Sequence, residues 1–200
     1  AGSILDVLFG EGHVQVFFVA GDGTKGFVDG PVGRLRSPDG LAVNSLGVAY
    51  VKERAKTKKP FFLYLPLPAP HTPIVPVPPF KGASKINPYA DFVMQMDGHV
   101  GDLLATIKEA GVDENTLVFF TSDNGCSPQG NFELLKEFGH DPSAGYRGHK
   151  ADVYEGGHRV PFIARWPKNI KAGQKTDALA CLTDLYDTMR EITGQSAEAN

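Results

Sequence analysis

The chain has 200 residues, 42% of them hydrophobic, which is enough for one fair-sized core or for one small and one medium unit. Its net charge of −3 is typical of an ordinary globular protein and gives no indication of nucleic-acid binding or of an acidic tail. The longest apolar runs are too short to span a bilayer. Only two cysteines occur, Cys126 and Cys181, so the composition excludes a disulfide framework and leaves a single bridge open.

The first fifty residues favour short antiparallel strands. Apolar runs lie at 14–19 and 47–51, and turns rich in glycine separate them. The stretch from about 14 to 51 resembles one NHL-type β-propeller repeat, with AGDG, DGP and PDGLAV as landmarks. One blade cannot bury both of its faces, because repeat architectures need several stacked units. We therefore expect residues 1–51 to be a short β-rich segment outside the main core, either added at an edge or loosely ordered.

A second region begins with the basic run at 52–59, which we interpret as the solvated end of a helix. A buried strand is predicted at 61–65, and it leads into Pro70-His71-Thr72-Pro73. Prolines on both sides hold the backbone extended, so His71 lies on a rigid connection after a strand. A lone histidine is usually an ordinary surface or core residue, and His71 becomes a candidate only in combination with later segments.

A long amphipathic helix follows. Asn87 is a suitable N-cap, Pro88 fits the first helical position, and Gly111 ends the pattern. Apolar residues recur between them at helical spacing: Phe92, Met96, Val100, Leu103, Leu104 and Ile107. Met94 and Met96 could suggest a cofactor-binding cluster, but core filling is the better interpretation. A helix between strands at 61–65 and 116–122 makes a βαβ unit, whose strands should be parallel and joined right-handedly.

The most informative stretch is Thr121-Ser122-Asp123-Asn124-Gly125, which follows the apolar run 117–120. The run predicts a buried strand, and its end places a carboxylate beside an amide oxygen where open α/β sheets bind ligands. Adjacent hard oxygens suit Ca²⁺ or Mg²⁺ better than a soft metal. Taken alone, Asp-Asn-Gly is more often only a turn, so the metal hypothesis needs support from other segments.

Two later segments complete the predicted scaffold. Residues 145–161 place many ionisable side chains among glycines, directly before a strand at 161–166. Such a loop is usually solvated, and it gains significance only from its neighbours. A final helix is predicted between the cap Thr183 and a stop at Gly194, where it would cover one face of the sheet. Its inward residues should be Leu185, Tyr186, Met189 and Ile192.

In this order and spacing the three segments resemble the sulfatase family. The matching pieces are KPFFLYLPLPAPHTP (59–73), NPYADFVMQMDGHVGDLLATIKEAGVDENTLVFFTSDNG (87–125) and GYRGHKADVYEGGHRVPFIARWP (145–167). The tail TDALACLTDLYDTMREITG (176–194) also fits, and the resemblance covers about residues 52–196. It implies an α/β fold of the alkaline-phosphatase superfamily, with a sheet flanked by helices, and hydrolysis of small-molecule or glycan sulfate esters. It also implies one Ca²⁺ ion and a formylglycine nucleophile made from Cys or Ser. We accordingly expect residues 52–200 to be part of a sulfatase catalytic domain.

The resemblance also assigns roles to particular residues. Asp123 and Asn124 match the family's pair of metal ligands. His71 matches a histidine that contacts the sulfate and the leaving-group oxygen, and Lys150 matches a lysine that reaches the same sulfate. These four residues are the predicted site.

Other polar residues in the same segments receive lesser roles. His149 is a weaker candidate that supports Lys150, whereas His158 and Arg159 are expected to stabilise their loop through backbone contacts or ion pairs. Cys126 begins a stretch similar to the family's C-x-P-x-R nucleophile segment. Because CSPQG (126–130) lacks the arginine and follows the metal pair, we interpret Cys126 as a loop cysteine.

The family's nucleophile segment and its other metal ligands precede the part represented here, so the chain is expected to be a sulfatase fragment that is inactive in isolation. The alternative hypothesis is a catalytically inactive binding or structural module containing a propeller piece. Export to the periplasm or the exterior is suggested by the family alone. The sequence leaves open which sulfate ester is the substrate, and the oligomeric state.

Overall fold

The computed structural model describes residues 14–20 and 41–194. They form four strands, five α-helices and two short 3₁₀ turns: β1 Val14–Ala20, α1 Leu41–Thr57, β2 Phe61–Leu67, α2 Pro88–Glu109, η2 Asp113–Asn115, β3 Thr116–Thr121, η3 Pro128–Gly130, α3 Phe132–Glu137, α4 Glu155–His158, β4 Phe162–Arg165 and α5 Asp184–Ile192. Within these residues, no helix combines the length and apolarity needed to cross a membrane. Cys126 is buried, Cys181 is exposed, and both are free thiols.

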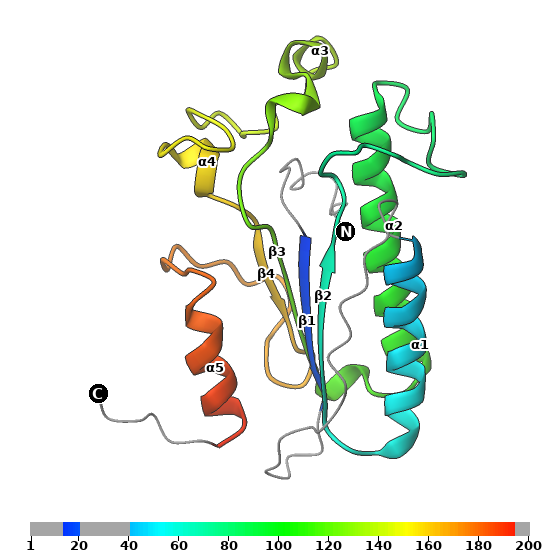
Figure 1. The fold of residues 1–200 in the computed structure, drawn as a ribbon. Helices are drawn as coiled ribbons and strands as arrows, with labels where there is room; N and C mark the ends of the chain where they lie inside the picture. The colour runs from blue at the N-terminus through cyan, green and yellow to red at the C-terminus, as the bar shows by residue number, and fades with distance from the viewer. Residues whose placement is uncertain (1–13, 21–40, 195–200) are drawn as a thin grey trace.

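The strands form one sheet in the order β2-β1-β3-β4, and every neighbouring pair is antiparallel. In the middle of the sheet, Phe17 pairs with Tyr64 on one side and with Phe119 on the other. Because β2 and β3 are each antiparallel to β1, they point in the same direction, as the predicted βαβ unit requires. They are not neighbours, however, since β1 lies between them. The carboxyl ends of β2 and β3 therefore reach the same end of the sheet (Figure 1).

Helices cover both faces of this sheet (Figure 1). On one face, α1 and α2 pack over side chains of β2 and β3 to make the main core. On the other face, α5 packs through Leu185 against Leu117 and Phe119 of β3. The six consecutive residues of β3 are all buried, which is the burial expected of a strand covered on both faces. The fold is α/β, as the sequence predicts.

The long helix α2 confirms its sequence prediction closely. The side chain of Asn87 accepts a hydrogen bond from the backbone of Ala90, and Pro88 occupies the first turn. Five of the six predicted core positions are buried and Leu104 is half-buried at the edge of the same cluster. Gly111, with φ +73°, follows the end of the helix and adopts the left-handed conformation that glycine tolerates best.

The front of the chain differs from its prediction. Residues 47–51 belong to helix α1 instead of a strand, and β1 is an interior strand of the sheet instead of an added edge. The predicted β-propeller resemblance is not supported, and its landmarks between 21 and 40 lie outside the described residues. Helix α1 also crosses the expected boundary at residue 51, and a division into two units stays a prediction.

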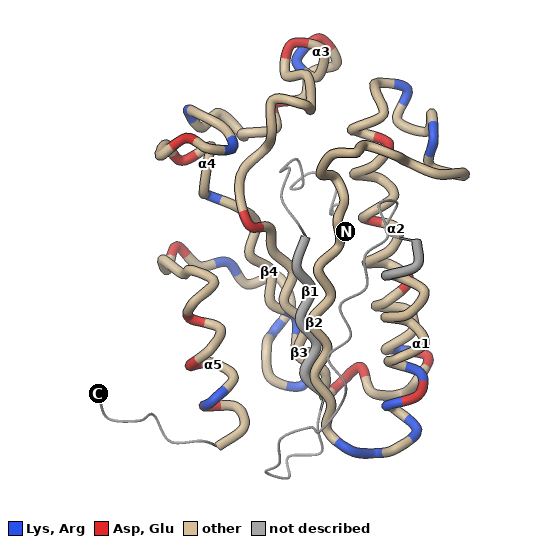
Figure 2. The backbone as a smooth tube through the Cα atoms, viewed as in Figure 1, with Lys and Arg blue, Asp and Glu red and all other residues tan. Residues whose placement is uncertain are grey.

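Packing explains why residues 47–51 are helical. Val51 is completely buried, and a side chain at Gly47 would lie only 3.1 Å from Leu65 and 3.3 Å from Leu103. The absence of a side chain at this position lets α1 approach both β2 and α2. Tertiary burial thus overrides the preference of valine, tyrosine and glycine for other structures. Figure 2 shows basic residues at the end of α1 and in the turn into β2. Most of them are exposed, which confirms that part of the prediction.

Helix α5 is confirmed in extent and only partly in orientation. Leu185 is buried and Met189 packs beside it, but Tyr186 is 69% exposed and Ile192 is 37% exposed. The inward assignment of Tyr186 and Ile192 was therefore wrong, because α5 buries only a narrow stripe against the sheet. Gly194 has φ +70° and follows the last turn, as predicted.

Candidate functional site

The turn after β3 holds the predicted metal ligands. Ser122 is buried, and its hydroxyl donates to the carbonyl of Asn124 over 3.1 Å. The amide Nδ2 of Asn124 donates to the carbonyl of Gly125 over 3.0 Å, which fixes the orientation of that side chain. Asp123 is exposed, and within the part of the chain that the structure describes no group donates to its carboxylate or pairs with it. A carboxylate and an amide therefore stand next to each other at the carboxyl end of β3.

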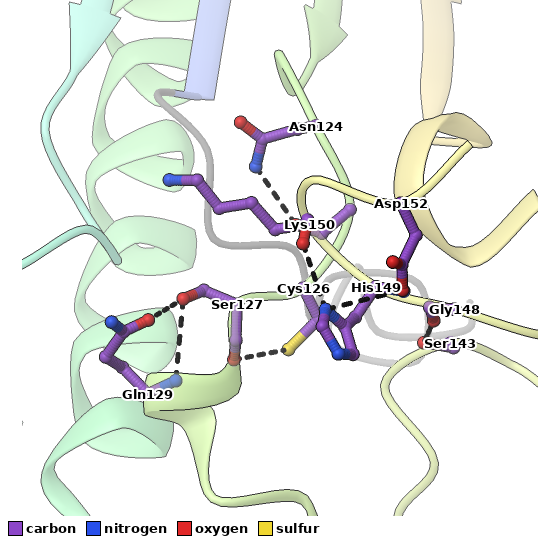
Figure 3. Close-up of polar contacts among 10 residues, drawn as sticks. Asn124, Cys126, Ser127, Gln129, Ser143, Gly148, His149, Lys150 and Asp152 are labelled. Atoms are coloured by element: carbon purple, nitrogen blue, oxygen red, sulfur yellow. Dashed lines mark hydrogen bonds and ion pairs between the residues drawn. The ribbon is translucent and has the colours of Figure 1, made fainter. Parts of the chain in front are cut away.

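A second loop brings Lys150 to this turn. The backbone N–H of Lys150 donates to the carbonyl of Cys126 over 2.8 Å, and the N–H of Gly125 donates to the carbonyl of Gly157 over 2.9 Å. The two bonds fasten the segment 147–157, at Lys150 and at Gly157, to the adjacent residues Cys126 and Gly125. Figure 3 shows Asn124, Cys126 and Lys150 gathered where the two segments meet. Asp123 and Asn124 are thus held beside Lys150 across a separation of about 25 residues in the sequence.

Glycines make this close approach possible. A Cβ atom at Gly125 would overlap the carbonyl oxygen of Gly156, and one at Gly156 would overlap that of Gly148. A Cβ atom at Gly157 would overlap the carbonyl oxygen of Asp152. Gly125 therefore allows the two segments to lie this close, whereas Gly156 and Gly157 allow the 147–157 segment to fold tightly on itself. The sequence prediction missed this role, although the Gly156-Gly157 pair beside the candidate lysine was the available signal.

His149 supports the backbone at Lys150. Its Nδ1 lies 2.9 Å from the carbonyl oxygen of Lys150, and because a carbonyl can only accept, Nδ1 carries the proton. The ring also packs against Phe132, with the centroids 5.5 Å apart. The N–H of His149 donates to the carboxylate of Asp152 over 3.0 Å. These contacts agree with a supporting position, and the role of His149 stays a prediction.

His158 and Arg159 act as predicted. The Nε2 atom of His158 lies 3.0 Å from the carbonyl oxygen of Val153, and Arg159 forms an ion pair with Glu155 at 2.9 Å. The Glu155 hydrogen bond raises the pKa of the exposed Arg159. Both residues therefore brace the α4 turn, through a backbone contact and an ion pair.

His71 follows the carboxyl end of β2 in the chain, as Asp123 follows that of β3, and these two strand ends lie at the same end of the sheet. Its backbone N–H donates to the carbonyl of Pro68 over 3.0 Å, and its Nδ1 lies 2.7 Å from the carbonyl oxygen of Thr72. Because a carbonyl oxygen can only accept, Nδ1 is the nitrogen that donates to it. Strand β1 separates β2 from β3. The two backbone hydrogen bonds between the segments 122–126 and 147–157 do not involve His71. Its place in a common site stays a prediction.

The segment that follows His71 is anchored to α2. The carboxylate of the buried Asp91 accepts hydrogen bonds from the backbone of Gly82 and from both the backbone and the hydroxyl of Ser84. Burial by itself would raise the pKa of Asp91, but these donors together lower it. Gln95 adds a bond from the N–H of Val77 at 2.8 Å. The loop after His71 is therefore held in one conformation by side chains of α2.

The residues present fit part of a Ca²⁺ shell. Within the described residues, no three His, Cys, Asp or Glu side chains are grouped closely enough to hold a metal ion. Asp123 and Asn124 supply two hard oxygen ligands, whereas Ca²⁺ takes six to eight. Cys126 is only 1% exposed and lies 3.5 Å from the hydroxyl of Tyr89, in keeping with its interpretation as a loop cysteine.

Comparison with known proteins gives one family. The family model described as Sulfatase matches residues 41–195. The chain is 36% identical to an N-acetylgalactosamine-6-sulfatase of Canis lupus familiaris over 146 residues, and 36% identical to an N-acetylgalactosamine-6-O-sulfatase of Bacteroides thetaiotaomicron over 143 residues. These matches cover 72% and 69% of this chain. The chain spans 27% of the length of each of these relatives.

Solved structures agree with this comparison. One, from work on glycosaminoglycan metabolism by Bacteroides thetaiotaomicron, has a TM-score of 0.74 and 31% identity, and covers 83% of this chain and 35% of its own. Another, i-CgsB in complex with k-i-k-neocarrahexaose, has a TM-score of 0.67 and 31% identity, and covers 78% of this chain and 34% of its own. The α/β arrangement described above is the one that these proteins share with the chain.

Proposed function

Because the chain belongs to the sulfatase family, we propose that the protein hydrolyses sulfate esters and that this chain supplies Lys150, His71, Asp123 and Asn124 to the site. The observation that supports this proposal most directly is the pair of backbone hydrogen bonds between the 122–126 and 147–157 segments. They bring the backbone of the loop that carries Lys150 to the turn that carries Asp123 and Asn124, at the carboxyl end of β3, where α/β sheets bind ligands.

Lys150 has the chemistry that the reaction needs. A sulfate ester carries dispersed negative charge, and its leaving oxygen gains more as the S–O bond breaks. A cation fixed near that oxygen stabilises the transition state more than the ground state. The ammonium group offers three donors as a compact point charge, so Lys150 can bind several sulfate oxygens at once.

His71 is proposed as the residue that protonates the departing alcohol. Such proton transfer typically contributes about 10²- to 10⁴-fold to the rate. Since the Nδ1 of His71 is bonded to the carbonyl of Thr72, the proton would pass through Nε2. This orientation requires the leaving oxygen to approach from the side of the ring opposite to Thr72.

Asp123 and Asn124 are proposed as two ligands of a Ca²⁺ ion whose other ligands come from outside these residues. When bound, such an ion neutralises sulfate charge and orients the groups around it. The exposed carboxylate of Asp123 and the amide of Asn124 are suitable hard ligands. A formylglycine nucleophile is likewise proposed from outside, because no C-x-P-x-R or S-x-P-x-R segment occurs in the 200 residues.

The substrate is proposed to be a sulfate ester of a glycan or of a small molecule. Curated relatives are named for both kinds: the N-acetylgalactosamine-6-sulfatases, and a steryl-sulfatase of Homo sapiens that is 38% identical over 141 residues. The choice between them depends on groups around Lys150 and not on the reaction itself.

A graft tests the proposal. The matched segment of the Bacteroides thetaiotaomicron relative is replaced by residues 41–195 of this chain, which begin with helix α1, and hydrolysis of an aryl sulfate is measured with Ca²⁺. We expect turnover that Lys150→Ala, Asp123→Ala or His71→Ala lowers by at least about 10²-fold. The 200-residue chain alone should give no turnover. A folded graft whose turnover is indifferent to all three substitutions would overturn the proposed roles.

A further inference from the structure

Arg147 is distinguished by its surroundings on the loop that carries Lys150. Its guanidinium carbon lies 3.8 Å from the centroid of the Tyr154 ring, which is a cation–π contact. Both residues are exposed, with Tyr154 at 42%. The carbonyl of Arg147 accepts a 2.8 Å hydrogen bond from Gly156, so the backbone below the side chain is fixed as well.

The other arginines nearby are already paired with carboxylates. Arg159 bonds to Glu155 over 2.9 Å, and Arg165 makes two hydrogen bonds with Asp113, at 2.8 and 2.9 Å. Among the described residues, no carboxylate forms an ion pair with Arg147. Its charge is therefore held in place without being neutralised.

Stacking on a tyrosine ring determines how such a guanidinium can bind a ligand. The ring occupies one flat face of the guanidinium, while the N–H groups around its edge remain able to donate in the plane. This edge matches two oxygens of a sulfate or a carboxylate. Because the stack limits the rotamers of Arg147 beforehand, less entropy is lost when the anion binds.

The position of Arg147 relates it to the proposed sulfate site. Arg147 and Lys150 lie three residues apart in a loop whose backbone is fastened to the turn of Asp123 and Asn124. Between 145 and 159 there are three Lys or Arg and two Asp or Glu, so this part of a chain that is negative overall is slightly basic (Figure 2). A second anionic group on the same substrate would thus meet a cation close to the first.

We propose that Arg147 is a specificity-determining residue that binds a second anionic group, a sulfate or a carboxylate, of a glycan whose target sulfate ester lies at Lys150. The substrate class is then an oligosaccharide with several charged groups, instead of a singly charged ester such as a sterol sulfate. The assignment of the first group rests on the proposed function, whereas binding at Arg147 does not.

Binding by the full 200-residue chain tests the inference without turnover. A chondroitin 6-sulfate tetrasaccharide is titrated calorimetrically at low and at moderate salt. We expect Arg147→Ala to weaken binding about tenfold or more, as for the loss of a charged hydrogen-bonding pair. Arg147→Lys keeps the charge but not the planar edge, and should lose affinity too. The matched control is Arg54→Ala, which removes a similar stack, 5.2 Å over Tyr50, on helix α1.

The remaining arms identify the anion and the kind of ligand. If Arg147→Ala also weakens binding of the desulfated tetrasaccharide, the bound group is the carboxylate; if only sulfated material is affected, it is a sulfate. Unchanged affinity in both Arg147 variants, with thermal unfolding intact, would overturn the inference. So would a single-stranded DNA of equal charge that binds as tightly as the glycan. If the graft gave no turnover but Arg147→Ala still weakened glycan binding, only the catalytic proposal would be rejected.

Discussion

Gly125 and its partners illustrate how single residues position the site. The backbone of Gly125 donates to Gly157 while its Cα faces the carbonyl of Gly156, so any side chain there would push the two segments apart. Lys150 depends on that contact, because its own N–H bonds to Cys126 one residue further along. The glycines thus act on the site through the backbone, without touching a ligand.

Replacing Gly125 with alanine should destabilise the chain and loosen the Lys150 loop. We expect a loss of about 1–3 kcal/mol in the free energy of unfolding, as for other overpacked positions, measured by urea denaturation. Hydrogen exchange at Lys150 should become faster at the same time. Gly101→Ala is the matched control, because Gly101 lies in α2 and a Cβ atom added there would have nothing within 4 Å. It should raise stability by about 0.5–1 kcal/mol, and equal effects at both sites would contradict the close-approach argument.

At the level of the elements, one ion pair ties β4 to the 3₁₀ turn before β3. Arg165 donates to both oxygens of Asp113, over 2.8 and 2.9 Å. The hydrogen bonds from Arg165 are the main cause of a lowered pKa at Asp113, and the same bonds raise the pKa of Arg165. Two connections far apart in the sequence are therefore coupled by a planar, bidentate contact.

This pair should contribute to stability in a pH-dependent way. Since the carboxyl of Asp113 has a lowered pKa in the folded state, its contribution is present above the ordinary value of about 3.9 and is lost as the pH falls through the folded value. We expect about 0.5–1 kcal/mol from a double-mutant cycle of Asp113→Asn and Arg165→Gln at pH 7, because both groups are partly exposed. The coupling should vanish in strong acid. The more exposed pair Arg159–Glu155 is the control and should give a smaller coupling energy. Equal coupling energies for the two pairs would contradict the argument that partial burial strengthens the Asp113–Arg165 pair.

Helices that are determined by nearby residues in the sequence were predicted well, and those that depend on tertiary contacts were not. Helix α2 was predicted from Asn87, Pro88 and its apolar spacing because capping and periodicity are local properties. Helix α1 was mistaken for a strand at 47–51 because its helical state depends on burial of Val51 and on contact of Gly47 with β2 and α2. The exposure of Tyr186 has a similar origin, since it depends on where α5 lies over the sheet.

At the level of the whole molecule, the candidate site was predictable in its chemistry and less so in its construction. Asp123, Asn124 and Lys150 were identified from strand ends and from a resemblance, and the structure joins their loops through the backbone. The glycine contacts that allow this were missed, since close approach between distant segments has no local pattern. The insertion of β1 between β2 and β3 was missed for the same reason, because strand order is set by long-range pairing.

The position of β1 leads to the last prediction. Val14–Ala20 pairs along its whole length with β2, and residues 15–20 pair with β3 as well, so the sheet is continuous only through this strand. Replacing Phe17 with proline removes a backbone N–H that could donate a hydrogen bond to a neighbouring strand, in the middle of an interior strand. We expect Phe17→Pro to lower stability by an amount comparable to the about 3 kcal/mol that proline costs inside a helix, seen as a large fall in the thermal midpoint.

The control is proline in a segment without such pairing. Lys175 lies within residues 171–180, which are exposed throughout, so Lys175→Pro should change stability by no more than about 0.5 kcal/mol. Deleting residues 1–20 should abolish the cooperative transition altogether, because β2 and β3 would lose their shared partner. A transition that survives both the deletion and Phe17→Pro would instead favour the division at residue 51, with a core that folds without the front segment.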